Sequence, residues 1–283
     1  MEVKIIAEIG INHNGSLDIA KKLIDTAKVA GFTYVKFQKR DVDLCIPKEQ
    51  RDVMRDTPWG RIPYYRYREY LEFGKDEYDE IDAYCRINGM KWFASAWDVN
   101  SIDFLKQYGY IVKIPSAKIT DSELISKART KFNVMIMSTG MSTQDEIDHA
   151  VELCHPEVIM ACNSAYPAPV NELDLGYIRY LKDRYKYVAH VVDGEYGPHM
   201  GYSGHDYGLV TTFAAVALGA KWIERHVTLD RTMYGSDQLS SIEPIGMIKL
   251  CKGIHDVESA LGGYCDRTVH DSELEKRKSL RGS

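Results

Sequence analysis

The sequence predicts an α/β protein built as a closed (β/α)₈ TIM barrel, and three observations support this fold. Short runs of β-branched and aromatic residues alternate with longer amphipathic stretches, as in successive strand–helix units. Eight such units fit into about 260 residues, close to the roughly 250 residues of one barrel of this kind. No GxGxxG motif follows a predicted strand in the 283 residues, which argues against an open dinucleotide-binding sheet.

Each predicted element follows from a local pattern. The strands are expected at residues 3–9, 34–37, 91–95, 111–114, 134–138, 158–162, 199–203 and 221–225. The clearest helix begins at Ser16 and ends at Ala30, because apolar side chains recur on one face and a glycine follows. Further helices are expected to begin at Ser122 and at Thr143, where Thr143 and Glu146 form a capping-box pattern.

Two segments depart from this repeat. Residues 41–75 are polar, Arg-rich and Tyr-rich, which indicates either a surface excursion packed by its aromatics or a lid at the barrel mouth. Residues 185–198 are expected to add a strand or hairpin. Residues 243–261 predict the closing helix, and residues 266–283 a frayed polar tail or short surface arm. The expected organisation is one barrel domain over residues 1–265, carrying the insertion, followed by the tail.

Composition favours a small-molecule ligand. The formal net charge of -5 offers no basic surface for nucleic acid or an anionic membrane. The six cysteines are scattered without a CxxC pair, which indicates free thiols in a reducing compartment. The first residues do not form a signal peptide, and no segment approaches a membrane-spanning apolar run. We therefore expect a cytoplasmic protein that binds neither nucleic acid nor membrane.

Functional side chains gather at the carboxyl ends of the predicted strands, where barrels of this class place their active sites. His205 and His226 end two strands that flank a helix at residues 209–218, so both imidazoles should emerge side by side and could share a divalent metal. With water and substrate oxygens, two imidazoles suit Mn²⁺, Mg²⁺, Co²⁺ or Zn²⁺ to different degrees. The other strand-end candidates are Glu8, Lys36, Gln38, Ser95, Lys113, Ser116, Lys118, Ser138, Thr139, Asn163, Ser164, Tyr166, Ser203 and Glu224.

These residue types together indicate an anion site, and hence a phosphorylated substrate used with a metal. Glu8 and Glu224 could polarise or deprotonate groups on a second substrate. Each residue alone has a structural alternative: Glu8 can pair with Lys36 inside the barrel, and Lys113 can be a solvated strand-end charge. The serines and threonines are often only turn or cap residues. The prediction therefore depends on their joint placement.

The motifs AEIGINHNG, VKFQ, KIPS, STGM, SAYP, GYSGH, ALGAKWIERHVTLDR and SIEP, in this order, resemble the sialic acid synthase family (N-acetylneuraminate and related nonulosonate synthases). The similarity covers nearly the whole barrel, and the combination of motifs is specific. It implies a (β/α)₈ barrel that condenses phosphoenolpyruvate with an N-acetylated hexosamine such as N-acetylmannosamine. The products would be phosphate and a 2-keto-3-deoxy sugar acid. A homodimer is also expected from the family.

The resemblance assigns roles to matching positions. Phosphoenolpyruvate would be held by Lys36, Lys113, Ser116, Ser138, Ser164 and Ser203. His205 and His226 would bind a divalent metal, usually Mn²⁺, with Mg²⁺ or Co²⁺ possible, that activates the acceptor aldehyde. Glu8 and Glu224 would orient acceptor or water and assist proton transfer. The acceptor would be bordered by Gln38, Tyr166 and Asp237.

Three departures from the family pattern affect the acceptor and the metal. Lys118 occupies the catalytic position where the family has an acidic residue. Gly204 replaces an acidic residue before His205, and Gln238 replaces a histidine in GSDQ, changes that can weaken metal binding. Family members also carry an antifreeze-like domain that supplies an arginine to the acceptor. We expect this chain to lack that domain, with residues 41–75 as the compensating acceptor loop.

Three functions remain open from the sequence. The leading one is a phosphoenolpyruvate-dependent, carbon–carbon bond-forming transferase of the nonulosonate type. The second keeps phosphoenolpyruvate and changes the acceptor, for example to an anionic sugar, or changes the chemistry to enolpyruvyl transfer. The third is a barrel that lost catalysis and serves as a binding module. Lys118 favours this last function, whereas His205, His226 and Glu224 argue against it.

Overall fold

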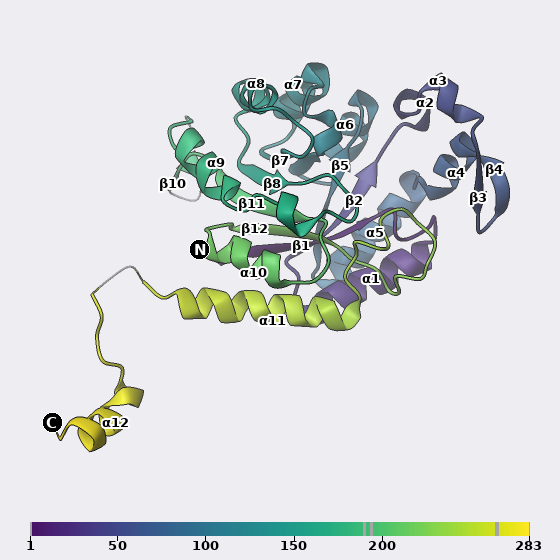
Figure 1. The fold of residues 1–283 in the computed structure, drawn as a ribbon. Helices are drawn as coiled ribbons and strands as arrows, with labels where there is room; N and C mark the ends of the chain where they lie inside the picture. The colour runs from purple at the N-terminus through teal and green to yellow at the C-terminus, as the bar shows by residue number, and fades with distance from the viewer. Residues whose placement is uncertain (1, 189–190, 193–194, 264–265, 283) are drawn as a thin grey trace.

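Eight parallel strands close into a barrel in the computed structural model of the chain, which confirms the predicted fold (Figure 1). The structure describes residues 2–188, 191–192, 195–263 and 266–282. Around the barrel the strand order is β1-β12-β11-β8-β7-β6-β5-β2, so neighbouring strands are also successive barrel strands of the chain. Their bounds are β1 (Lys4–Gly10), β2 (Tyr34–Lys39), β5 (Lys91–Ala96), β6 (Ile111–Ile114), β7 (Val134–Ser138), β8 (Val158–Cys162), β11 (His199–Gly204) and β12 (Trp222–His226). Each overlaps its predicted run.

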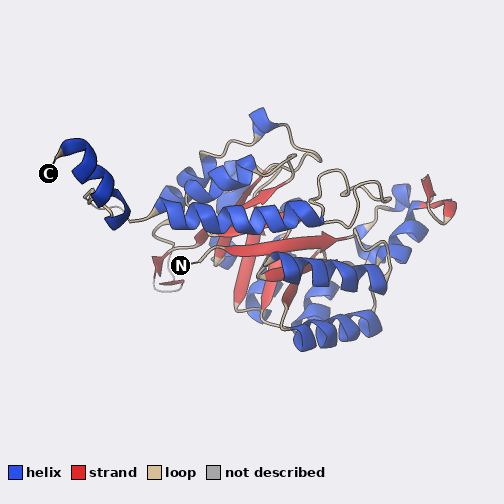
Figure 2. Ribbon diagram, turned by 90° about the horizontal axis from the view of Figure 1, so that it is seen from below, coloured by secondary structure: helices blue, strands red, loops and turns tan. Residues whose placement is uncertain are grey.

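Helices surround the barrel (Figure 2). They are α1 (Leu17–Ala30), α5 (Lys75–Asn88), α6 (Val99–Lys106), α7 (Ser122–Lys131), α8 (Gln144–Cys154), α9 (Tyr177–Tyr185), α10 (Val210–Ala217) and α11 (Pro244–Leu261), with short 3₁₀ turns η1 (Ser116–Lys118) and η2 (Val170–Glu172). The predicted helix starts are confirmed: Ser16 caps α1 through the Ile19 N–H, and Thr143 and Glu146 form the capping box of α8. The buried face of α1 packs into the core between barrel and helices.

The barrel interior is built in layers, which explains where the polar residues lie. The apolar layer contains Ile6, Tyr34, Phe93, Ile111, Ile136, Val158, Met160 and Trp222. Because strand side chains alternate between two faces, the residue two positions later points inward again. On six strands that next residue is polar and buried: Glu8, Lys36, Ser95, Lys113, Ser138 and Glu224. The strand register therefore sets a ring of charged and hydroxyl groups directly above the apolar layer.

The insertion at residues 41–75 is a folded unit beside the barrel mouth (Figure 1). It consists of α2 (Val42–Cys45), α3 (Lys48–Arg51), the hairpin β3 (Met54–Thr57) and β4 (Gly60–Pro63), and α4 (Tyr64–Leu71). Tyr67 of α4 packs against the ring of Tyr234 at 5.8 Å, and the Tyr234 hydroxyl donates to the Asp56 carbonyl at 2.8 Å. A Cβ at Gly15 would lie 2.0 Å from the Tyr70 carbonyl oxygen, so glycine lets the loop after β1 approach α4.

The remaining segments lie away from the barrel mouth. β9 (Val191–Val192) pairs antiparallel with β10 (Glu195–Tyr196), as predicted for residues 185–198, although positions 189–190 and 193–194 lie outside the described residues. The expected tail contains an exposed helix, α12 (Asp271–Arg281), set apart from the barrel (Figure 1).

Two predictions drawn from composition concern the cysteines and the membrane. Five cysteines are free thiols: Cys45, Cys85, Cys154, Cys162 and Cys251. Cys265 lies outside the described residues. Among the helices that the structure describes, none is long and apolar enough to cross a bilayer.

Candidate active site

A cavity of about 140 Å³ opens at the carboxyl end of the barrel. Its lining includes most of the predicted site residues, namely Glu8, Lys36, Gln38, Lys113, Ser116, Ser138, Ser164, Tyr166, Ser203, His205, Glu224 and His226. A wider hollow of about 790 Å³ adjoins it and shares Met141, Cys162 and Ser164. The smaller cavity carries both lysines, both histidines and the two buried glutamates, so we assign it as the candidate reaction site.

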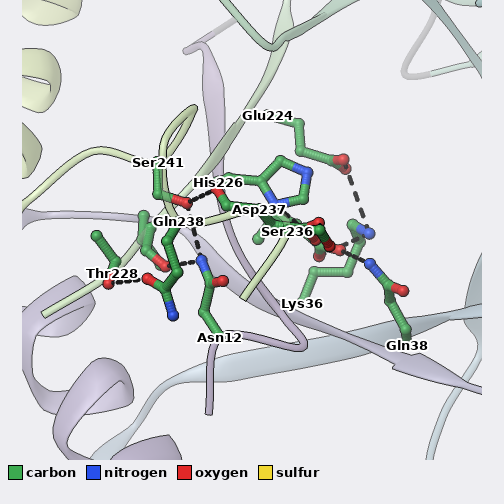
Figure 3. A network of polar contacts seen from close by, with 12 residues as sticks. Asn12, Lys36, Gln38, Glu224, His226, Thr228, Ser236, Asp237, Gln238 and Ser241 are labelled. Atoms are coloured by element: carbon green, nitrogen blue, oxygen red, sulfur yellow. Dashed lines mark hydrogen bonds and ion pairs between the residues drawn. The ribbon is translucent and has the colours of Figure 1, made fainter. Parts of the chain in front are cut away.

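Two lysines and two glutamates form a buried charge network in this cavity, and Figure 3 labels Lys36 and Glu224 of this network. Lys113 Nζ lies 2.6 Å from Glu224 Oε1, and Lys36 Nζ lies 2.7 Å from Glu8 Oε2 and 3.7 Å from Glu224 Oε1. Lys36 also donates to the Ser95 hydroxyl at 2.9 Å. The network holds equal numbers of positive and negative groups, and each lysine faces the open cavity.

The two carboxylates titrate differently because their neighbours differ. Burial raises the pKa of Glu8 to about 6, although Lys36 opposes the rise. Burial would also raise the pKa of Glu224, but Lys113 and Lys36 outweigh it and lower that pKa to about 2. Two carboxyl groups with separated pKa values can take different roles, one remaining ionised while the other exchanges protons near neutral pH.

Burial acts on both lysines, with different outcomes. Burial lowers the pKa of Lys113 despite the nearby Glu224. Burial also lowers the pKa of Lys36, but Glu224 and Glu8 together outweigh it, so the pKa of Lys36 is raised. Lys36 is therefore the more firmly charged of the two cations.

Hydroxyl and amide groups at the ends of β6 and β7 complete an anion-binding surface. The Ser138 hydroxyl is buried and has no hydrogen-bond partner among the described residues. Ser116 Oγ accepts the Gly140 N–H at 3.0 Å, and a Cβ at Gly140 would lie 2.2 Å from Ser164 Oγ. The backbone therefore approaches the serines closely only because residue 140 is glycine. Ser203 donates to Glu224 Oε1 at 3.4 Å.

The paired histidines lie together as the strand–helix–strand pattern predicted. Their ring centroids are 5.3 Å apart. His205 Nδ1 lies 2.6 Å from the Asn163 carbonyl, and donation there leaves a lone pair on Nε2 when the ring is neutral. Burial lowers the pKa of His205, but the neighbouring Cys162 thiol outweighs burial, so the pKa of His205 is raised. His226 Nδ1 is buried without a hydrogen bond, and lies 3.6 Å from Asp237 Oδ2. Burial lowers the pKa of His226 to about 3, which keeps that imidazole neutral.

These donors fit a divalent ion held by two imidazoles. An unpartnered buried ring nitrogen on His226 and a free Nε2 on His205 are the lone pairs such an ion requires. Across the described ranges, no group of three or more His, Cys, Asp or Glu side chains forms a larger ligand set. The remaining positions on the ion would therefore be filled by water and substrate oxygens.

The predicted acceptor residues lie around the histidines. Tyr166 packs on His205 at 4.0 Å and meets His226 edge-on at 5.7 Å. Gln38 donates to Glu8 Oε1 at 2.8 Å, and Asp237 faces His226 from the loop that follows β12 (Figure 3).

Lys118 is placed differently from the other predicted catalytic residues. It ends η1, pairs with Asp121 at 3.5 Å and does not line the reaction cavity.

The two other departures from the family pattern are Gln238 and Gly204, and each lies in tightly packed surroundings. Gln38 and Lys36 face the cavity, whereas Gln238 points away from them and bonds Thr228 (Figure 3). It is fully buried and supports the loop that carries Asp237. A Cβ at Gly204 would lie 2.6 Å from the Tyr202 ring, so an acidic side chain at position 204 would require that ring to move.

Sequence reasoning missed Trp97, Met141 and Cys162 as lining residues. Cys162 is one of the cysteines expected as free thiols, and it follows Met160 by two positions, so strand periodicity places it facing inward. Burial would raise the pKa of Cys162, but the His205 imidazole beside it at 3.7 Å lowers it to about 7. The alternation rule could have found Cys162, whereas Trp97 and Met141 lie on loops and carry no such signal.

Known proteins are similar to this chain in sequence and in fold. Residues 23–266 match the NeuB family. The chain is 37% identical to N-acetylneuraminate-9-phosphate synthase of Drosophila melanogaster, over 98% of this chain and 80% of that protein. It is 34% identical to N,N'-diacetyllegionaminic acid synthase of Campylobacter jejuni, over 91% of this chain and 77% of that protein.

A solved structure agrees with these relatives. The crystal structure of N-acetylneuraminic acid (sialic acid) synthetase from Leptospira borgpetersenii, in complex with citrate, superposes with a TM-score of 0.83 at 30% identity. The match covers 100% of this chain and 94% of that chain. The chain therefore belongs to the NeuB family, and the resemblance to sialic acid synthases expected from its sequence is confirmed.

Proposed function

We propose that the barrel mouth condenses phosphoenolpyruvate with the open-chain aldehyde of an N-acetylated hexosamine, forming a 2-keto-3-deoxy sugar acid and phosphate. The observation that carries this proposal is the buried network of Lys36, Lys113, Glu8 and Glu224 at the base of a cavity that also holds two imidazoles. Relatives named for sialic and legionaminic acid synthesis support the same reaction class.

Phosphoenolpyruvate carries a phosphate and a carboxylate, and the cavity offers complementary groups. Lys36 and Lys113 supply two buried cations, which bind anions strongly where water is excluded. The unpartnered Ser138 hydroxyl and the serines Ser116, Ser164 and Ser203 supply neutral hydrogen bonds. The lysines also stabilise the phosphate as it leaves with its negative charge.

The reaction balances with water as the only other reactant. The C2–C3 π electrons of phosphoenolpyruvate form the new bond from C3 to the aldehyde carbon, and the aldehyde oxygen takes a proton. Water adds to the oxocarbenium left at C2. The resulting tetrahedral carbon then expels phosphate and becomes the ketone. The bridging oxygen therefore departs with phosphorus.

The two glutamates take separate parts in this scheme. Glu224 stays ionised and fixes Lys113 and Lys36 in place, as its low pKa allows. Glu8, with a pKa of about 6, moves a proton at the acceptor oxygen or the attacking water. Gln38 orients Glu8 through the 2.8 Å hydrogen bond to Oε1.

His205 and His226 would hold the divalent ion, for which we propose Mn²⁺, with Mg²⁺ or Co²⁺ as alternatives. The chemistry that such an ion supplies when bound is polarisation of the acceptor carbonyl. Tyr166 and Asp237 flank this position and border the acceptor. The catalytic role expected for Lys118 stays a prediction. Its ammonium pairs with Asp121, and Lys118 does not line the reaction cavity.

The direct test incubates the protein with phosphoenolpyruvate, Mn²⁺ and a panel of aldoses and N-acetylhexosamines. Phosphate release is measured, and the sugar acid is identified by mass spectrometry. We expect acceptor-dependent phosphate release in wild type and its loss in Glu224→Gln, with Glu69→Gln, whose side chain is 37% exposed, as the matched control. Phosphoenolpyruvate binding without phosphate release from any acceptor would instead favour the binding-module function.

A further inference from the structure

The segment INHNG that follows β1 takes no part in the proposed reaction, yet the side chain of its asparagine Asn12 lies close to the site. Asn12 is 1% exposed, and its Nδ2 donates to the Val227 carbonyl at 2.9 Å and to Ser241 Oγ at 2.8 Å. Val227 directly follows His226, and Ser241 ends the loop that carries Asp237. One amide group therefore contacts both ends of that loop.

The loop of residues 228–241 contains no helix or strand, so its course depends on side-chain and backbone contacts. Its two ends are paired: the Ile242 N–H donates to the His226 carbonyl at 2.8 Å, and the Thr228 N–H donates to the Ile242 carbonyl at 3.0 Å. The Thr228 hydroxyl also donates to Gln238 Oε1. These bonds close the loop on itself and on the strand that it leaves.

Ser241 extends the contact from Asn12 to Asp237 (Figure 3). The Ser241 hydroxyl accepts from Asn12 Nδ2 and donates to the Asp237 carbonyl at 2.6 Å. The Asp237 side chain places Oδ2 at 3.6 Å from His226 Nδ1, and Ser236 donates to Oδ1 at 2.7 Å. A chain of two hydrogen bonds therefore connects the segment after β1 to the residue whose carboxylate faces His226.

The segment after β1 is a firm support for this contact. The Asn12 N–H donates to the Ile9 carbonyl at 2.8 Å, which holds the backbone in a turn. The next residue, His13, is buried, stacks on Phe73 at 4.0 Å and accepts the Gly15 N–H at Nδ1. Because the turn is anchored on both sides of Asn12, the amide has a fixed position from which to hold the loop.

The two contacts need a short neutral side chain with two N–H donors. An amide carries two such donors, whereas a hydroxyl carries one and an ionised carboxylate none. Both donors of Asn12 are used, while its Oδ1 is buried with no hydrogen-bond partner among the described residues. A buried polar atom without a partner costs free energy. Asn12 is therefore best explained by what its two donors hold in place.

We propose that Asn12 is a positioning residue, which acts through Ser241 to hold the Asp237 carboxylate beside His226 and the acceptor. This inference depends on the proposed condensation and its metal site. A carboxylate attracts a divalent cation and accepts hydrogen bonds from sugar hydroxyls, so its displacement weakens the binding of both. Phosphoenolpyruvate is affected little, because none of its proposed lysine and serine ligands comes from β12 or from the loop after it.

The test compares two neighbouring serines of the loop. Ser241→Ala removes the hydroxyl that joins Asn12 to Asp237. Ser240→Ala is the matched control, because Ser240 is only 2% exposed and its hydroxyl has no hydrogen-bond partner in the described part of the chain. Asn12→Ala removes both donors at once. Steady-state kinetics give KM for phosphoenolpyruvate and for N-acetylmannosamine, or for the aldose of the panel that turns over fastest, and calorimetry gives the Mn²⁺ dissociation constant.

Ser241→Ala should raise both the acceptor KM and the Mn²⁺ dissociation constant at least fivefold, and Asn12→Ala should raise them at least tenfold. KM for phosphoenolpyruvate should change less than about twofold in both variants, and Ser240→Ala should match wild type throughout. In an Asp237→Ala background, adding Asn12→Ala should raise the acceptor KM by less than about twofold, because a residue that acts through Asp237 has little effect once that carboxylate is gone.

Several results would overturn the positioning role of Asn12. They are an unchanged acceptor KM or Mn²⁺ affinity in folded Ser241→Ala, an equal effect of Ser240→Ala, and a parallel rise in KM for phosphoenolpyruvate. An undiminished effect of Asn12→Ala in the Asp237→Ala background would do the same. Thermal unfolding of each variant checks that altered binding does not reflect unfolded protein.

Failure of the proposed function gives a different pattern. Phosphate release with no acceptor contradicts the condensation, whereas the Mn²⁺ titration of Ser241→Ala and Ser240→Ala still decides whether Asn12 and Ser241 position the site. A wild type that neither releases phosphate nor binds Mn²⁺ overturns both proposals.

Discussion

Lys113 Nζ lies 2.6 Å from Glu224 Oε1 inside the barrel, where both side chains are only 4% exposed. Burying an ion pair costs desolvation energy that the attraction between the charges often only offsets. An apolar layer here would serve folding at least as well, as the layer beneath it does. The pair is therefore best explained by what its lysine binds, namely the anionic groups of phosphoenolpyruvate.

Lys113→Met should damage both folding and substrate binding. The change keeps an unbranched side chain of nearly the same length but removes the ammonium, and leaves Glu224 with Lys36 at 3.7 Å and the Ser203 hydroxyl at 3.4 Å. We expect the free energy of unfolding to fall by about 3 kcal/mol, near the lower end for a broken buried pair. KM for phosphoenolpyruvate should rise at least tenfold. Urea unfolding and steady-state kinetics measure the two effects.

The control is Lys75→Met, which removes an exposed lysine paired with Asp79 on α5. It should change stability by less than about 0.5 kcal/mol and leave KM as it is. Similar effects from both substitutions would argue that Lys113 has no special role.

Glu8 should make stability depend on pH. Its pKa is raised from 4.5 to about 6 in the folded protein, so the folded state holds this proton more tightly than the unfolded chain. Protonated Glu8 therefore adds to the free energy of unfolding below pH 4.5, and this stabilisation is lost as the pH rises through about 6. Over this range the free energy of unfolding of wild type should fall by on the order of 2 kcal/mol relative to that of Glu8→Gln. Urea unfolding of both proteins across this range measures it, and a constant difference would contradict the raised pKa.

His205→Ala and His226→Ala should each weaken Mn²⁺ binding at least tenfold, because each removes one of two imidazole ligands. Calorimetric titration with Mn²⁺ measures this directly, without and with phosphoenolpyruvate. His149→Ala, an exposed histidine on α8, should bind as wild type does. Absence of Mn²⁺ binding to wild type under both conditions would rule out the two-histidine site for this metal.

Gly140→Ala should close part of the phosphate-binding surface. The added Cβ would lie 2.2 Å from Ser164 Oγ and 3.0 Å from Ser116 Oγ, so the serines must shift. We expect a loss of about 1–3 kcal/mol in stability and at least a tenfold rise in KM for phosphoenolpyruvate. Gly109→Ala, where the new Cβ meets no atom within 4 Å, is the control. Unaltered KM in Gly140→Ala would place phosphoenolpyruvate elsewhere.

The carboxyl ends of the predicted strands supplied most of the residues that line the candidate reaction cavity, and strand periodicity explains why. Once Ile6 and Tyr34 are placed in the barrel interior, Glu8 and Lys36 follow on the same inward face. The strand–helix–strand connection likewise predicted that His205 and His226 lie side by side. These inferences need only the alternation of strand side chains, the order of strands and helices, and the closed parallel topology.

The cavity that Arg40 and Arg68 line was beyond such reasoning. Arg40 follows a barrel strand and Arg68 lies on α4, and they meet only because the insertion folds back onto the barrel. That docking depends on contacts such as the packing of Tyr67 on Tyr234, which no periodic pattern encodes. The sequence suggested an acceptor role for residues 41–75 but could not say that Arg68 of this segment would line the same cavity as Arg40.

The most direct test of the central claim is the fate of the bridging oxygen of phosphoenolpyruvate. Phosphoenolpyruvate labelled with oxygen-18 between C2 and phosphorus is converted in the presence of the acceptor, and both products are examined by mass spectrometry. Condensation followed by attack of water at C2 places the label in inorganic phosphate and leaves the sugar acid unlabelled at its ketone. Label retained in the organic product would mean that the phosphorus–oxygen bond breaks instead, and would contradict the reaction proposed for this barrel.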